Sequence, residues 1–227
     1  MIRRSSIGRL CCWAIAAGAA GAAGAAPPAA LVEEVRGPVA GIEFMDYVVS
    51  GQRIALGERG VLVLGYLRSC WRETIAGGTV TVGDDGSVVQ GGRIERTKVA
   101  CDPGHAPLNA REATQSAATV FRGLPGGGVA EPPPVTVYGL SPVFDVGDRR
   151  GRLRIERVAP SGEAVEIAVD AASMVAGRFV DLARAGTALT PGATYAARLG
   201  DAHVGFKVDW DAQPGSTPIA GRLLRLE

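Results

Sequence analysis

The chain has little of what catalytic and metal sites are built from. It contains two histidines in 227 residues, His105 and His203, and aromatic residues make up only 5%. Lysine plus arginine number 24 against 23 aspartate plus glutamate, so no strong field of one sign would attract nucleic acid or an acidic surface. We therefore expect no nucleic-acid partner, no metal site and no cofactor.

Reaction motifs are also lacking. The sequence has no nucleophile elbow, phosphate-binding loop, HExxH motif or EF-hand loop. Asp84 and Asp85 could contribute to a calcium site, but without further oxygen ligands the sequence Gly-Asp-Asp-Gly favours a hairpin turn. These absences favour a protein that is not an enzyme.

No segment after the first 30 residues is long and apolar enough to span a membrane. Residues 1–25 have the organisation of a signal peptide, with basic residues, an apolar stretch over 10–20, and Ala-Gly-Ala at 23–25 as a cleavage site. The pair Arg3-Arg4 leaves the twin-arginine route open beside the general one. We predict a periplasmic or secreted protein with no membrane span once the signal is removed.

Cysteine is scarce, and two of the four cysteines fall within the signal. The remaining pair, Cys70 and Cys101, is most simply a disulfide in an exported protein. In the chain-entropy model, closing this loop is worth roughly 3–4 kcal/mol. A metal or redox pair involving Cys101 and His105 is the alternative, but the spacing is not C-x-x-C and no second ligand pair is present.

Glycine is abundant, at 32 residues, and it divides the first half into short β-branched runs. We predict turns at residues 57–60, 77–78, 83–86 and 91–92. The continuous apolar run at 61–64 is typical of a strand covered on both faces. Such short strands and frequent turns predict an all-β unit.

After residue 104 the spacing of the apolar residues changes from that of strands to that of a helix. Residues 109–112 have the form of a helix capping box, and an apolar stripe follows to Phe121. The Gly/Pro-rich segment 123–134 is typical of a linker. We therefore expect a β-domain with a terminal helix over 31–122, then the linker, then a second domain over 135–227.

The second domain shows several short strand patterns separated by Gly and Pro. A helical turn is expected at residues 181–186. Six strands in this length indicate a two-sheet sandwich similar in architecture to immunoglobulin or fibronectin type III modules, without their Cys…Trp…Cys core. The predicted strands are Val135–Tyr138, Arg152–Val158, Ala164–Val169, Thr194–Leu199, His203–Val208 and Arg222–Leu226.

Four glycine-containing segments carry a resemblance to a known family: 35–39, 51–57, 60–64 and 83–87. With these, the region from about residue 31 to 100 resembles a FecR-type periplasmic domain. Members of that family relay an envelope signal to a sigma factor through a cytoplasmic segment and one membrane span. Only nine residues precede Leu10 here, so the resemblance implies a β-domain that makes contacts in the periplasm, without the sigma-factor role. The second half resembles the C-terminal sandwich of other exported proteins, and no activity follows from that.

Three hypotheses of function follow. The favoured one is a non-enzymatic protein-interaction or sensor-accessory module that binds an envelope or inner-membrane protein, and it predicts an apolar patch or an exposed sheet edge. The second is a module for cell-wall glycan or a small ligand, which predicts a concave site around Trp71 or Trp210. In this hypothesis Asp209 and Asp211, which flank Trp210, are ligand-binding residues of an acidic sugar-binding cleft. The third, ranked last, is a hydrolase in which Asp209 or Asp211 faces a second carboxylate across a cleft.

Overall fold

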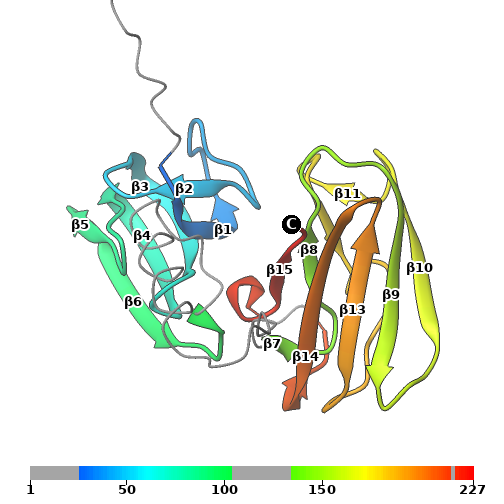
Figure 1. Cartoon of the computed structure of the whole chain (residues 1–227). Coiled ribbons are helices and arrows are strands. Elements are labelled where there is room, and N and C mark those ends of the chain that lie inside the picture. Colours follow the sequence, from blue (N-terminus) through cyan, green and yellow to red (C-terminus); the bar gives the residue numbers. More distant parts are fainter. Residues whose placement is uncertain (1–25, 104–133, 216–217) are drawn as a thin grey trace, which may run out of the picture.

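The computed structural model describes residues 26–103, 134–215 and 218–227. Within these ranges the regular structure is almost entirely β-strand, with a 3-10 turn η2 (Ile219–Gly221) before the last strand. The prediction of an all-β protein with several sheets is confirmed. The predicted helix at 109–121 and residues 123–133 of the predicted linker lie outside the described residues. In Figure 1 an N-terminal sheet lies beside a C-terminal sandwich, with the last strand of the chain between them.

The N-terminal unit is one antiparallel sheet. Its strand order is β2-β1-β3-β4-β5, and β6 pairs with the same edge of β4 as β5 does. The strands are β1 (Pro28–Arg36), β2 (Tyr47–Val49), β3 (Arg53–Tyr66), β4 (Trp71–Thr81), β5 (Val88–Gln90) and β6 (Arg93–Lys98).

The predicted turns at 57–60 and 77–78 are wrong, because both lie inside continuous strands. Gly57 of β3 pairs with Gly78 of β4, and the register slips on either side of Gly57. On the next strand, Gly91 and Gly92 separate β5 from β6 at the same level. Glycine therefore accompanies an irregularity in the pairing of β3 with β4, where a bulge bends the sheet in place of the expected turn. The predicted hairpin turn at 83–86 is present, with Gly83 N donating to Gly86 O at 3.1 Å.

The run at 61–64 is covered on both faces, as its continuous apolar pattern predicts. Leu62, Val63 and Leu64 are at most 1% exposed. Leu62 and Leu64 belong to the core of the N-terminal unit, together with Ile75 and Val80 of β4.

The C-terminal unit is a two-sheet sandwich. Its larger sheet has the order β10-β9-β13-β14-β7 and its smaller sheet the order β11-β12-β8-β15. The larger sheet comprises β7 (Val135–Gly139), β9 (Gly151–Ala159), β10 (Ala164–Val169), β13 (Thr194–Leu199) and β14 (Ala202–Gln213). The smaller sheet comprises β8 (Val143–Asp145), β11 (Met174–Val175), β12 (Phe179–Asp181) and β15 (Leu223–Arg225).

All six strands predicted for this half are present, and β10 and β13 have the predicted bounds. Strand β14 extends past the predicted end at Val208 to Gln213. The expected helical turn at 181–186 is a hydrogen-bonded turn in which Ala185 N donates to Asp181 O at 3.2 Å. The sequence did not predict β8, β11 and β12, because two or three residues are too few to show an alternating pattern.

Strands β8 and β12 of the smaller sheet are buried on both faces, so the two units share a core. On its inner side Phe144 packs edge-on against Phe206 of the larger sheet, with ring centroids 5.9 Å apart. On its outer side Val143 and Phe179 pack against Leu31 of the N-terminal unit. Apolar contact thus joins the two units directly.

Polar contacts reinforce this junction. Tyr47 Oη donates to Asp145 Oδ2 at 2.9 Å across the two units. Arg178 binds the same carboxylate through Nε at 2.8 Å and Nη2 at 3.0 Å, while Asp145 is only 2% exposed. Ala220 N donates to Glu33 Oε1 at 3.1 Å. A buried carboxylate needs such partners to offset its lost hydration.

The predicted disulfide is confirmed. Cys70 and Cys101 are bonded, with their Cα atoms 5.7 Å apart. The bond joins the turn before β4 to the segment after β6. The next residue, Asp102, accepts a hydrogen bond from Thr136 N at 3.0 Å, which brings the end of the N-terminal unit to the start of the sandwich.

Candidate functional site

Trp71, a predicted ligand-binding residue, lies at the start of β4 beside the disulfide. Its side chain packs against the N-terminal core, and the ammonium of Lys98 lies 4.9 Å from the ring centroid. This is a cation–π arrangement. A ring face covered in this way is not free to stack on a sugar.

Trp210 is different, because its side chain is 72% exposed. Its ring lies against the backbone of Gly192, so closely that a Cβ on Gly192 would come within 2.5 Å of three ring atoms. The indole is therefore held on the surface by packing on one side. Glycine is required beneath it both for space and for its backbone φ of +74°.

The two predicted acidic residues do not form a cleft around this ring. The pairing of β14 with β7 shifts register between Val208 and Gln213, so regular strand alternation does not place these side chains. Asp209 Oδ1 accepts a hydrogen bond from Asp211 N at 2.9 Å, so the two residues form one local turn. Two carboxylates held in one turn do not face each other across a cleft.

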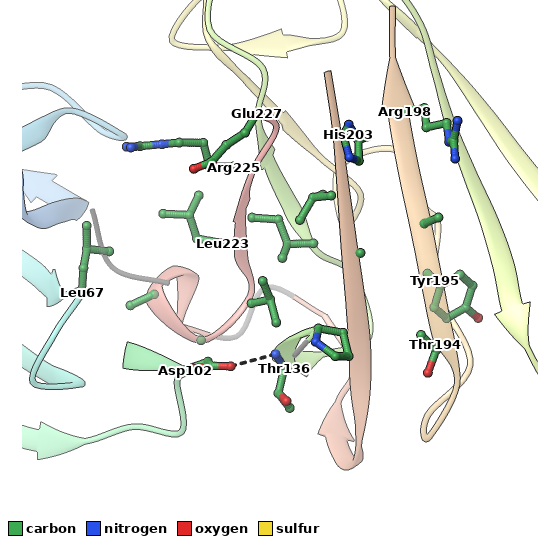
Figure 2. A pocket seen from close by; sticks show the side chains of 18 of the residues that line it. Leu67, Asp102, Thr136, Thr194, Tyr195, Arg198, His203, Leu223, Arg225 and Glu227 are labelled. Carbon is green, nitrogen blue, oxygen red and sulfur yellow. Dashed lines mark hydrogen bonds between the residues drawn. The ribbon is translucent and has the colours of Figure 1, made fainter. Parts of the chain in front are cut away.

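A groove of about 890 Å³ lies between the two units. Leu67 lies on its N-terminal side, and Leu223 and Arg225 of β15 lie in its centre, with Arg198 and His203 of the larger sheet beyond (Figure 2). None of the four predicted ligand-binding residues lines it. A position between two units is common for ligand sites.

The groove carries charges of both signs, which leaves its chemistry undefined. Arg198 and Arg225 contribute positive charge, and Asp102 and Glu227 contribute negative charge. Asp102 is already engaged by Thr136 N, as the dashed line in Figure 2 shows. The groove charges therefore favour neither an anionic nor a cationic ligand. Among the residues that the structure describes, no group of three or more His, Cys, Asp or Glu side chains could hold a metal ion.

The open side of the sandwich is formed by β10 and β11, the terminal strands of its two sheets. In Figure 1 β10 is the outermost strand on the side away from the N-terminal unit. Arg157 N of β9 donates to Glu163 O, and the antiparallel register continues from there through β10. Because such a ladder bonds alternate residues, the N–H and C=O groups of Ala164, Glu166 and Ala168 point away from β9.

The apolar side chains at this edge are incompletely covered. Val165 and Ile167 of β10 and Met174 of β11 pack against the sandwich core but stay partly exposed. Among the described strands none pairs with the outer edge of β10, and partly exposed core side chains lie beside that edge. Natural sheets usually shield such an edge, because it can pair with another chain.

The edge of the N-terminal sheet illustrates such protection. Among the strands that the structure describes, β6 pairs only with β4, and its six residues, RIERTK, include four charged side chains. Charged residues, lysine above all, discourage pairing with another strand. By contrast, β10 reads AVEIAV, with one charge in six residues.

Sequence reasoning predicted β10 correctly as a strand but did not single it out as a site. The signal available was its apolar alternation with a single charge. That pattern is equally expected for a central strand, and only the sheet order places it at an edge.

Comparison of the chain with family models, curated proteins and solved structures found no match. The resemblance of the N-terminal region to FecR-type domains therefore stays a prediction. No helix in the described part of the chain is long and apolar enough to cross a membrane.

Proposed function

We propose that this protein is an exported, non-enzymatic module that binds a protein partner of the cell envelope, and that it does so by accepting an extended segment of that partner along β10. The N-terminal unit, a FecR-like sheet in this proposal, acts as a rigid scaffold. The proposal rests chiefly on one observation, the open edge of β10 with Val165, Ile167 and Met174 partly exposed beside it.

Strand addition fits this edge for two physical reasons. The outward N–H and C=O groups of β10 supply the hydrogen-bond ladder that an added strand needs. The partly exposed core side chains supply apolar area, and fully burying a side chain of the size of valine or isoleucine is worth ~1.5–3 kcal/mol.

Two features that favour export also support a partner in the cell envelope. The first 25 residues have the pattern of a secretory signal, and the Cys70–Cys101 bond requires an oxidising compartment to persist. Such a location places the partner in the periplasm, the inner membrane or outside the cell.

The test begins with the mature chain, residues 26–227, immobilised and exposed to detergent-solubilised envelope proteins. A retained protein is then purified, and its direct affinity for the module is measured by calorimetry. We compare Ala168→Pro, which removes an outward N–H of β10, with Ala168→Ser, which keeps it. The proposal expects at least a tenfold weaker affinity for the proline variant and an unchanged affinity for the serine variant. Retention of no protein, or equal affinities for the two variants, would overturn it.

A second candidate function, binding of cell-wall glycan, is favoured by Trp210 on Gly192. A flat indole open on one side offers a stacking surface for a sugar ring. In this case purified peptidoglycan retains the module, Trp210→Ala abolishes retention, and Ala168→Pro leaves it unchanged. Retention that is the same with and without the indole would exclude Trp210 as the platform.

A further inference from the structure

We infer that the Cys70–Cys101 bond is a redox-dependent clamp on the groove between the two units. Its formation fastens the end of the N-terminal unit to the C-terminal unit and so completes one wall of the groove, in addition to closing a loop of the N-terminal sheet. No residue of β10 lines this groove, so the clamp is independent of strand addition and goes beyond the proposed function.

The segment that follows β6 contacts the C-terminal unit on both sides of Cys101. Before it, the carbonyl oxygen of Ala100 lies so close to Gly221 that a Cβ on this glycine would come within 2.2 Å of it. After it, Asp102 accepts the hydrogen bond from Thr136 N at 3.0 Å. The covalent bond of Cys101 thus ties two contacts with the C-terminal unit back to the N-terminal one.

These contacts form part of the groove itself. Asp102 and Thr136 line the groove, and Leu67 and Gly221 line it as well. Figure 2 shows Leu67 on the N-terminal side and the hydrogen bond between Asp102 and Thr136. The sulfur of Cys101 lies 3.9 Å from the backbone oxygen of Leu67. The disulfide therefore lies where the N-terminal wall of the groove meets the C-terminal wall.

The backbone of Cys70 is also held by this bond. Its φ is +54°, in the left-handed region that residues with a Cβ rarely adopt. Such a conformation persists only where the surrounding structure enforces it. Two constraints do so here, the disulfide and the hydrogen bond that Val99 N donates to Cys70 O at 2.9 Å. Without the disulfide, we expect the turn before β4 to relax.

Closing the clamp is a two-electron oxidation by an oxidant that carries a disulfide. One cysteine thiolate attacks that disulfide, which forms a mixed disulfide and releases one thiol of the oxidant. The second cysteine thiolate then displaces the other oxidant sulfur, so the Cys70–Cys101 bond forms and the oxidant leaves as a dithiol that carries both protons. Both cysteines are at most 9% exposed in the folded protein, so this exchange takes place before the segment has packed. The clamp thus closes during folding in an oxidising compartment.

Amide hydrogen exchange of the mature chain, residues 26–227, tests the clamp. The N–H of Thr136 reports on it directly, because its acceptor is Asp102. Val137 is the control in the same strand, since alternate residues of a strand bond to opposite sides and its N–H faces β14. Leu64 of β3, which is paired on both sides, reports on the N-terminal sheet. Two-dimensional NMR follows the three amides separately.

Two double variants lack the bond. Cys70→Ser with Cys101→Ser removes it, and Cys70→Gly with Cys101→Ser removes it while glycine adopts the left-handed turn at no steric cost. In both, we expect the Thr136 amide to exchange at least about tenfold faster than in the parent protein, and the two control amides to change by less than about twofold. The glycine variant keeps the test decisive if the serine variant does not fold.

A second pair of variants keeps the disulfide and tests the contact that it holds in place. Asp102→Ala removes the acceptor of the Thr136 N–H and should reproduce the faster exchange of that amide. Asp102→Asn keeps an acceptor oxygen and should not.

Three results would overturn the clamp. The first is unchanged exchange of the Thr136 amide in the variants that lack the disulfide. The second is equal acceleration at Thr136 and Leu64, which would show that the bond supports the N-terminal sheet as a whole. The third is unchanged exchange of the Thr136 amide in Asp102→Ala, which would show that Asp102 does not fasten the two units.

Discussion

Glu73 shows how a single buried charge is accommodated in the N-terminal unit. The residue is 0% exposed, and its carboxylate accepts hydrogen bonds from Arg96 Nε at 2.7 Å and from Ser87 N at 3.0 Å. Ser87 in turn shares a 2.8 Å hydrogen bond with the Tyr66 hydroxyl, which is also buried. Such a network is stable only when each buried polar group has a partner.

Tyr66 gives this network a measurable signature. Burial, as the largest cause, raises the pKa of Tyr66 to about 12, and the negative charge of Glu73 also raises it. The unfolded chain loses the phenol proton near pH 10, so between about pH 10 and 12 the folded state binds more protons than the unfolded state. The free energy of unfolding must therefore fall as the pH rises through this window.

Between about pH 10 and 12, we predict that the free energy of unfolding falls less for Tyr66→Phe than for the parent protein. The difference between the two falls should reach up to about 2 kcal/mol. Urea unfolding at a series of alkaline pH values measures the difference, and tyrosinate absorbance reports the titration itself. Because burial also raises the pKa of Tyr47, a decline that remains in the variant is expected. Equal declines in the two proteins would show that Tyr66 is not the titrating group.

At the scale of elements, glycines decide how closely neighbouring strands of the N-terminal sheet approach each other. Gly78 has φ +76°, and a Cβ there would lie 2.3 Å from the backbone oxygen of Gln90. A Cβ on Gly92 would lie 2.2 Å from the backbone oxygen of Gly77. The neighbouring strands thus approach each other at this level more closely than any side chain allows.

We predict that Gly78→Ala destabilises the protein by more than about 3 kcal/mol, through backbone strain and a collision with backbone atoms. Gly51→Ala is the matched control, because Gly51 has φ +84° but nothing within 4 Å of the added Cβ. Strain alone should cost the control about 1–2 kcal/mol. Urea unfolding compares the two, and similar losses would mean that the sheet relaxes around the added methyl group.

These elements also show where sequence patterns were informative. Strands β10 and β13 were predicted with their bounds because six residues of alternation define a face. Glycine pairs, in contrast, looked like turns, since a bulge and a turn require the same backbone freedom. Only the partner strand distinguishes them.

For the whole molecule, the shared core predicts that the two units unfold together. Leu31 and Met45 of the N-terminal unit pack with Val143 and Phe179 of the sandwich, and Asp145 binds Tyr47 across the junction. Because each unit covers an apolar face of the other, separation exposes surface on both.

We predict one cooperative urea transition for the parent protein and two separated transitions for Asp145→Asn, with a loss of about 2 kcal/mol at the junction. The control is Asp181→Asn, since Asp181 binds the buried Arg222 at 2.7 Å inside the sandwich. That variant should be destabilised while keeping a single transition. A single transition in both variants would show that apolar contact alone couples the units.

The sequence by itself determined the all-β class and the disulfide, because alternation and cysteine pairing are local or compositional signals. The sequence also named Trp210 as a candidate binding residue, but only the tertiary structure shows that its side chain is exposed. Tertiary structure decided which strand became an edge, that Glu73 and Asp145 would be buried, and that the two units would share a core. Those outcomes depend on contacts between residues far apart in the chain, such as Tyr47 with Asp145, and no local pattern encodes them.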